Sequence, residues 1–251
     1  MSKNDNTLIV GKVLEHFKEV SSTNEIALRK LASGDAEDGM VISTEYQTAG
    51  RGQRGSQWES QSGENLLLSV ILRPAFLKVT QQFQLTKMAS LGVSRTVQSF
   101  GLPAQIKWPN DIMVEGKKLA GILIQNIIQA SKIEATVMGI GLNINQSEFP
   151  RVPNATSMRQ ELGHKLDLIT IRSRLFSALD KYYSLLKSTK KDLDEEYHSQ
   201  LFRLGERSRF LTPNHSDFYG KIVGVNEEGK LMVSDDSGSL KTFEMKEIIY
   251  P

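Results

Sequence analysis

Hydrophobic residues follow helical spacing in two long segments of this chain and gather into short runs elsewhere. Apolar positions at helical spacing predict a long helix from Thr80 to Phe100 and another from Ile171 to Leu186. A shorter helix is predicted around Leu193, Tyr197 and Leu201. Apolar runs bounded by turn residues predict strands at 13–20, 40–44, 65–72, 112–114, 119–128 and 136–144.

The start of a further helix is predicted directly after the first strand. Ser22 is followed three residues later by Glu25, which is the capping-box pattern of a helix N-terminus. Gly34 is a natural stop for this helix, because glycine readily adopts the left-handed conformation found after helix ends. We therefore expect a short helix between these residues.

The pattern changes from about Gly205. Short strands are predicted at 219–225, 231–233 and 240–243, with turn sequences at 226–229 and 235–238. They predict a small β-barrel domain at 205–251 after a larger domain at 1–204. The larger part lacks a regular alternation of strands and helices, so we expect an α+β fold rather than a doubly wound parallel sheet.

Composition excludes several classes of protein. The chain has 251 residues, of which 39% are hydrophobic and 24% charged, as in an ordinary globular protein. It has no cysteine, which excludes disulfides, thiolate zinc sites and a cysteine nucleophile. The net charge of +2 does not favour a dedicated nucleic-acid binder. The polar N-terminus lacks a signal-peptide pattern, and no apolar run approaches a membrane span, so we expect a cytoplasmic protein.

A glycine-rich loop is the strongest candidate for chemistry. Gly50 to Gly55 carries Arg51 and Arg54, and Trp58 follows closely. Glycines allow backbone N–H groups to surround an anion, and the arginines add fixed positive charge. The Gly-Lys-Ser/Thr ending of a Walker loop is missing. Taken alone, the loop is as consistent with a flexible surface loop or a non-specific RNA-binding segment, taken together, as with a phosphate site.

Three further segments place polar residues beside predicted strands. In the segment from Lys107 to Asp111 a lysine stands next to a rigid Trp-Pro pair, which would fix its approach to a charged group. The sequence Pro-Asn-Asp is also common in ordinary turns. Asp111 is placed to orient the lysine or to hold Mg²⁺. Gly116 to Leu123 and Gly139 to Asn145 combine small residues with Lys118 and Asn143, which in isolation also fit a solvated charge and a capped strand end.

The order of these segments decides between the readings, because together they resemble the biotin protein ligases. The segments that carry the resemblance are, in chain order, 22–24, 45–52, 107–111, 118–122 and 139–145, followed by 155–158. The tail from Gly205 is similar to the SH3-like C-terminal domain of the family. The resemblance implies a catalytic domain similar to class II aminoacyl-tRNA synthetases.

The family activates biotin with ATP as biotinyl-5'-AMP and transfers it to a lysine of a biotin carboxyl carrier protein. The resemblance assigns biotin binding to Ser22, Thr23, Asn24, Gln47, Arg51, Gly52, Gln53 and Lys107. It assigns ATP binding to Arg51, Arg54, Trp58, Asn110, Lys118, Asn143 and Asn145, and catalysis to Lys107, Arg51 and Asp111. Mg²⁺ is expected with ATP; no direct metal motif is present, and Asp111 is the candidate ligand.

The sequence departs from the family pattern at two places. Gln53 stands where many relatives have arginine, so we expect the adenylate to be held less tightly. About 20 residues precede Ser22, too few for the DNA-binding domain of bifunctional relatives, so we expect no DNA binding. The resemblance also allows a homodimer that pairs through the strand at 119–128. The alternatives are a lipoate or octanoate ligase of the same superfamily and a non-catalytic RNA-binding module.

Overall fold

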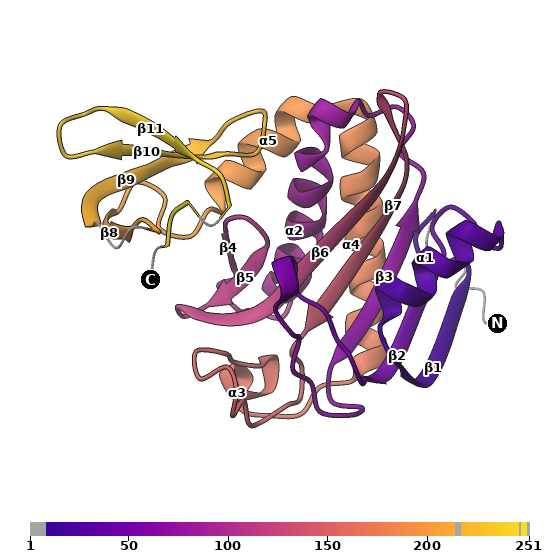
Figure 1. Ribbon diagram of the computed structural model, residues 1–251. Coiled ribbons are helices and arrows are strands. Elements are labelled where there is room, and N and C mark those ends of the chain that lie inside the picture. Colours follow the sequence, from indigo (N-terminus) through magenta and orange to yellow (C-terminus); the bar gives the residue numbers. More distant parts are fainter. Residues whose placement is uncertain (1–8, 214–216, 246, 250–251) are drawn as a thin grey trace.

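The computed structural model describes residues 9–213, 217–245 and 247–249, except the side chain of Arg54. Within these residues a large mixed sheet is covered by helices, and a smaller antiparallel sheet lies beside it (Figure 1), which confirms the α+β prediction. The large sheet has the spatial order β1 (Leu14–Val20), β2 (Val41–Gln47), β3 (Leu66–Leu72), β7 (Lys132–Leu142), β6 (Lys117–Gln129), β5 (Asp111–Val114) and β4 (Gln105–Lys107). Only the β1–β2 pair among them is parallel.

Helices cover both faces of the large sheet. The helices are α1 (Thr23–Ser33), α2 (Phe83–Gln98), α3 (Met158–Leu162), α4 (Leu168–Ser188) and α5 (Lys190–Ser199), with 3₁₀ turns η1 (Gln53–Gly55) and η2 (Val79–Gln81). The long helices α2 and α4 pack on one face over the main hydrophobic core, whereas α1 lies on the other face (Figure 1). In the part of the chain that is described, no helix is long and apolar enough to span a membrane.

The start of α1 differs from the predicted capping box. Ser22 occupies the N-cap position, but its side chain makes no capping hydrogen bond. Glu25 instead accepts a hydrogen bond from Ser21 Oγ at 2.9 Å and lies 3.8 Å from Arg51 Nη2. Gly34 ends the helix at φ +81°, as predicted. The capping-box prediction is therefore wrong, and the Ser22 side chain faces the cavity described below.

The smaller sheet has the order β11 (Leu240–Phe243), β10 (Leu231–Asp235), β9 (Asp217–Val225) and β8 (Arg207–Leu211). The first of these in the sequence, β8, was not predicted, because its exposed arginines alternate with the buried Ser208 and Phe210. One contact of this sheet with the rest of the protein is made by Val225, whose N–H donates to His198 Nε2 on α5 at 3.0 Å.

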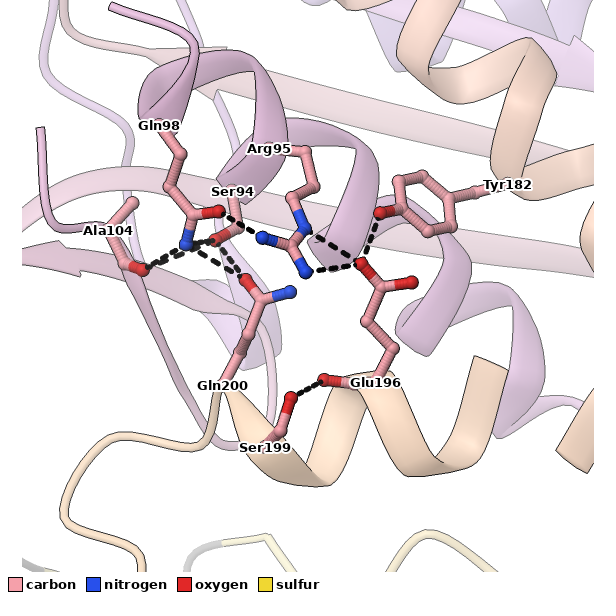
Figure 2. Close-up of polar contacts among 8 residues, drawn as sticks. All are labelled: Ser94, Arg95, Gln98, Ala104, Tyr182, Glu196, Ser199 and Gln200. Atoms are coloured by element: carbon pink, nitrogen blue, oxygen red, sulfur yellow. Dashed lines mark hydrogen bonds and ion pairs between the residues drawn. The ribbon is translucent and has the colours of Figure 1, made fainter. Parts of the chain in front are cut away.

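A polar cluster fixes α5 against α2 and α4 (Figure 2). Glu196 on α5 accepts from Tyr182 Oη and pairs with Arg95 Nη2, each at 2.6 Å. Burial, followed by the nearby Glu196 carboxylate, raises the pKa of Tyr182 to about 12. Gln200, which follows α5, accepts from Ser94 Oγ at 2.7 Å. The cluster thus fixes the point at which the chain leaves α5 and returns to the large sheet.

Candidate active site

A cavity of about 230 Å³ lies on the α1 face of the large sheet, over the start of β5 and the interior of β6 and β7. The predicted residues that line it are Ser22, Thr23, Asn24, Gln47, Arg51, Gly52, Gln53, Trp58, Asn110, Asp111 and Lys118. They come from the start of α1, the glycine-rich loop with the segment that follows it, and the strands β2, β5 and β6. The fold therefore brings together motifs that are far apart in the sequence.

Three glycines form the floor of this cavity. Gly121 on β6 pairs with Gly141 on β7, and Gly139 lies two residues away on the same face. A Cβ atom at Gly139 would overlap Asn24 Oδ1, and one at Gly141 would overlap the Trp58 ring. The absence of side chains here allows the indole and the amide to approach the backbone of the sheet closely.

An uncharged hydrogen-bond network forms one end of the cavity. Gln47 Oε1 accepts from the backbone N–H of Thr23 at 2.8 Å. Ser69 Oγ lies 2.7 Å from Thr23 Oγ1 and 2.6 Å from Asn24 Oδ1. Asn24 Nδ2 donates to Gln125 Oε1 at 2.8 Å. This end therefore offers hydroxyl and amide groups that are held in fixed orientations.

Sequence reasoning missed Ser69 and Gln125, although a signal was present. Ser69 is the single polar residue in the otherwise apolar strand β3, and it is completely buried. A buried hydroxyl needs a hydrogen-bond partner, so a serine inside an apolar strand indicates that other polar groups lie next to it.

The glycine-rich loop folds over the cavity. Gly52 N–H donates to Ser56 O at 2.7 Å, and Trp58 N–H donates to Gly50 O at 3.0 Å. Arg51 and Gln53 line the cavity from this loop. The Arg54 side chain, which was also predicted to bind ATP, lies outside the described part of the structure.

Cationic side chains gather beside the loop. Lys118 Nζ pairs with Asp111 Oδ1 at 2.7 Å and lies 5.8 Å from the centre of the Trp58 ring. Lys107, at the end of β4, pairs in register with Asp111 and lies beside the cavity rather than among its lining residues.

The charge of Lys107 is affected by its surroundings. Burial lowers the pKa of Lys107 below that of an ordinary lysine. The Asp111 carboxylate opposes this shift, whereas Arg203 and Lys118 add to it. Arg203 is a cation that sequence reasoning missed, because it lies far from the motifs in the sequence. The surplus of positive charge suits the binding of an anion.

A second cavity of about 50 Å³ lies behind Trp58, between Lys118, Asn143 and the segment 149–155. Two of its lining residues have buried polar atoms without a partner among the described atoms, Trp58 Nε1 and Asn143 Oδ1. The first is a donor and the second an acceptor, so they are complementary to the edge of a heterocyclic base.

Asn145 does not face either cavity. Its Nδ2 donates to Leu166 O and its Oδ1 accepts from Leu166 N, each at 2.9 Å. Both ends of the amide are therefore used in holding the loop that follows β7.

The described residues do not fit a metal site made by the protein alone. They contain no group of three or more histidine, aspartate or glutamate side chains placed to hold a metal ion. The Asp111 carboxylate, which was the candidate Mg²⁺ ligand, is paired with Lys118. His215 lies outside the described residues.

The chain is similar to known proteins in sequence and in fold. The bifunctional ligase/repressor BirA of Bacillus subtilis is 32% identical over 243 residues, covering 94% of this chain and 74% of that protein. The biotin–[acetyl-CoA-carboxylase] ligase of Mycobacterium tuberculosis is 32% identical over 222 residues, covering 87% and 82%. The structure of the biotin protein ligase of Aquifex aeolicus with biotin and ATP matches with a TM-score of 0.78 and 27% identity, covering 96% of this chain and 99% of that one. Residues 16–143 match the biotin/lipoate A/B protein ligase family, and the chain belongs to that family.

Proposed function

We propose that this protein is an ATP-dependent biotin protein ligase, which forms biotinyl-5'-AMP and transfers the biotin to a lysine of a biotin carboxyl carrier domain. The observation that carries the proposal is the division of one cavity into an uncharged hydrogen-bonding end and a cationic end. A substrate with a neutral ring at one end and a carboxylate at the other fits this arrangement.

The uncharged end suits the ureido ring of biotin. A ureido group has both donors and acceptors, and Thr23, Asn24 and Gln47 present both kinds of group. Ser22 presents a hydroxyl that is not used for helix capping. The carboxylate of biotin then points along the glycine floor toward Arg51 and Lys107.

The cationic end suits the nucleotide. We assign the adenine to the region of Trp58 and Asn143, because an aromatic face and an unpaired acceptor lie together there. Arg51, Lys107 and Lys118 then surround the phosphates. Asn110, whose Nδ2 donates to Ile122 O at 2.6 Å, forms part of the wall beside these phosphates. Asn145 supports the site through the loop that it holds rather than by contact.

The chemistry requires no nucleophile from the protein. The biotin carboxylate attacks the α-phosphorus of ATP, which gives the adenylate and releases pyrophosphate. The acceptor amine then attacks the carbonyl carbon of the mixed anhydride, and AMP leaves. Negative charge develops on phosphate oxygens in the first step, so cations fixed in advance are the main catalytic device. We assign Mg²⁺ no protein ligand; Asp111 orients Lys118.

The same family includes lipoate ligases, so the substrate needs a direct test. Purified protein is incubated with ATP, biotin and a biotin carboxyl carrier domain, with lipoate as the competitor. We expect ATP-dependent transfer of biotin that excess lipoate does not inhibit. Transfer of lipoate at a comparable rate, or biotin transfer without ATP, would contradict the proposal.

A homodimer is a further part of the proposal. Within the described residues β6 pairs with β5 only as far as Gly121, so its second half presents a free edge, and Ile128 there is 50% exposed. An exposed apolar edge of this kind is suited to pairing with another strand.

We expect Gln53 to weaken retention of the adenylate. It lines the main cavity and also a neighbouring cavity of about 370 Å³ below the β9–β10 turn. A charged hydrogen bond is worth about 1.5–3 kcal/mol against about 1 for a neutral one. We therefore expect Gln53→Arg to slow dissociation of the adenylate roughly tenfold, as followed by stopped-flow tryptophan fluorescence.

The control for this variant is Gln61→Arg, which adds the same charge at an exposed position that does not line the cavity. It is expected to leave the dissociation rate unchanged. If Gln53→Arg releases the adenylate as fast as the original protein, another cation already supplies the missing charge.

A further inference from the structure

The strand that carries Lys107 is held by residues from the far end of the chain. Ile106 N–H donates to Gln200 O, and Ile106 O accepts from Phe202 N–H, each at 2.8 Å. Lys107 itself pairs with Asp111 on the opposite side of β4. The residue before the lysine is therefore fixed to the segment that connects α5 with the smaller sheet.

The residue after the lysine is fixed to the smaller sheet itself. Trp108 is buried, and its indole Nε1–H donates to Gly229 O at 2.9 Å. Gly229 belongs to the turn between β9 and β10, which is separated from Trp108 by 121 residues in the sequence. The two neighbours of Lys107 are thus both held by residues beyond position 199.

The Gly229 carbonyl has a fixed position. Gly229 N–H donates to Asn226 O at 3.0 Å, and Lys230 N–H donates to Asn226 Oδ1 at 2.8 Å. Gly229 has φ +88°, and a Cβ atom there would overlap the Phe83 ring on α2. The turn is therefore closed by its own hydrogen bonds and packs against α2, which covers one face of the large sheet.

The position of the Lys107 backbone matters because a lysine side chain is flexible. Its ammonium is a point charge on a flexible stem, so the place from which the stem starts determines where the charge is held. A displacement of about 1 Å in an active site can cost about 10²-fold in rate. A buried indole N–H that loses its acceptor also costs about 1–3 kcal/mol, which favours keeping the contact intact.

We propose that the β9–β10 turn is a positioning element for the first chemical step: the Gly229 carbonyl, acting through the Trp108 indole, fixes the strand end from which Lys107 reaches the reacting groups. This inference rests on the proposed ligase function. It gives the smaller sheet a part in adenylate formation, although Trp108 is a positioning residue and touches no substrate.

The test uses Trp108→Phe, which keeps a buried aromatic ring and removes the N–H donor. We expect kcat for biotin-dependent pyrophosphate release to fall about tenfold or more, with the KM for biotin changed less than about twofold. The same substitution is then made in a Lys107→Ala background, in which residual activity is followed by radiolabelled pyrophosphate exchange. If Trp108 acts through the lysine, Trp108→Phe should lower the residual exchange rate by less than about twofold in that background.

A second variant loosens the turn without changing the indole. Asn226→Ala removes the side-chain acceptor of the turn, and we expect a smaller decrease in kcat, again present only with Lys107. The matched control is Asp235→Ala, which removes the side-chain acceptor of the β10–β11 turn in the same sheet, where it binds the N–H groups of Ser237 and Ser239. It is expected to lower the melting temperature without changing kcat.

The outcomes separate the two proposals. An unchanged kcat in Trp108→Phe, or an equal loss with and without Lys107, overturns the positioning role of the turn. Absence of biotin-dependent pyrophosphate release from the unmodified protein instead rejects the ligase function.

Discussion

Lys107→Ala is expected to lower the rate of biotin-dependent pyrophosphate release by about 10²–10³, the usual cost of removing one preorganised group that stabilises developing charge. Lys107 lies at the end of β4, in register with Asp111 and next to Lys118 and Arg203, so its charge is part of a cationic cluster.

The measurement compares single-turnover pyrophosphate release by the variant and by a control. Lys132→Ala removes an exposed lysine at the start of β7 and should leave the rate unchanged. Circular dichroism and the melting temperature check that the fold is intact. Near-normal release from a folded Lys107→Ala protein would exclude this lysine from the chemical step.

Trp58→Ala is expected to weaken the binding of ATP far more than that of biotin. Stacking of an aromatic ring on a base is worth about 1–3 kcal/mol, which corresponds to roughly 5- to 150-fold in Kd. The Trp58 indole lies over Gly141 and lines the second cavity with Asn143, and the hydrogen bond between Thr23 and Gln47 does not involve it. Removing it should therefore leave the biotin end intact.

Calorimetric titration with each ligand in turn distinguishes this role from a packing role. Trp58→Phe, which keeps a ring, should retain most of the affinity for ATP. Equal losses for ATP and biotin in Trp58→Ala, together with a lower melting temperature, would mean that the indole only closes the loop.

The sequence predicted those parts of the fold that depend on local hydrophobic patterns. The buried strands β3, β5, β6 and β7 were found because each has its own apolar run, and the helix α4 because its apolar residues recur at helical spacing. The strand β4 was missed, because only Ile106 of its three residues is buried, and its pairing with Gln200 and Phe202 joins distant parts of the chain.

Helix boundaries were predicted less well than helix cores. The helix predicted from Thr80 begins at Phe83, after a 3₁₀ turn, and ends at Gln98, so Phe100 lies beyond it. Leu201 likewise lies beyond α5. Hydrophobic spacing continues past these ends because the following residues still face the core.

Site residues that lie within a sequence motif were predicted. Those that reach the site only through the tertiary fold were missed. The loop residues Arg51 and Gln53 follow from their motif, and the structure places both at the cavity. Gln125 and Arg203 have no motif around them, and they meet Asn24 and Lys107 only after the sheet and the C-terminal segment have assembled. A motif records local sequence, whereas these contacts are made across the fold.

The glycine floor has a consequence for local opening of the sheet. Amide hydrogens at the centre of a sheet are ordinarily among the slowest in a protein to exchange with solvent. At Gly121, Gly139 and Gly141 the backbone is covered by the Trp58 indole and the Asn24 amide instead of by side chains of the strands themselves. Exchange at Gly121 and Gly141 is therefore expected to depend on movement of the segment that carries Trp58, because displacement of the indole would expose the middle of β6 and β7 to water.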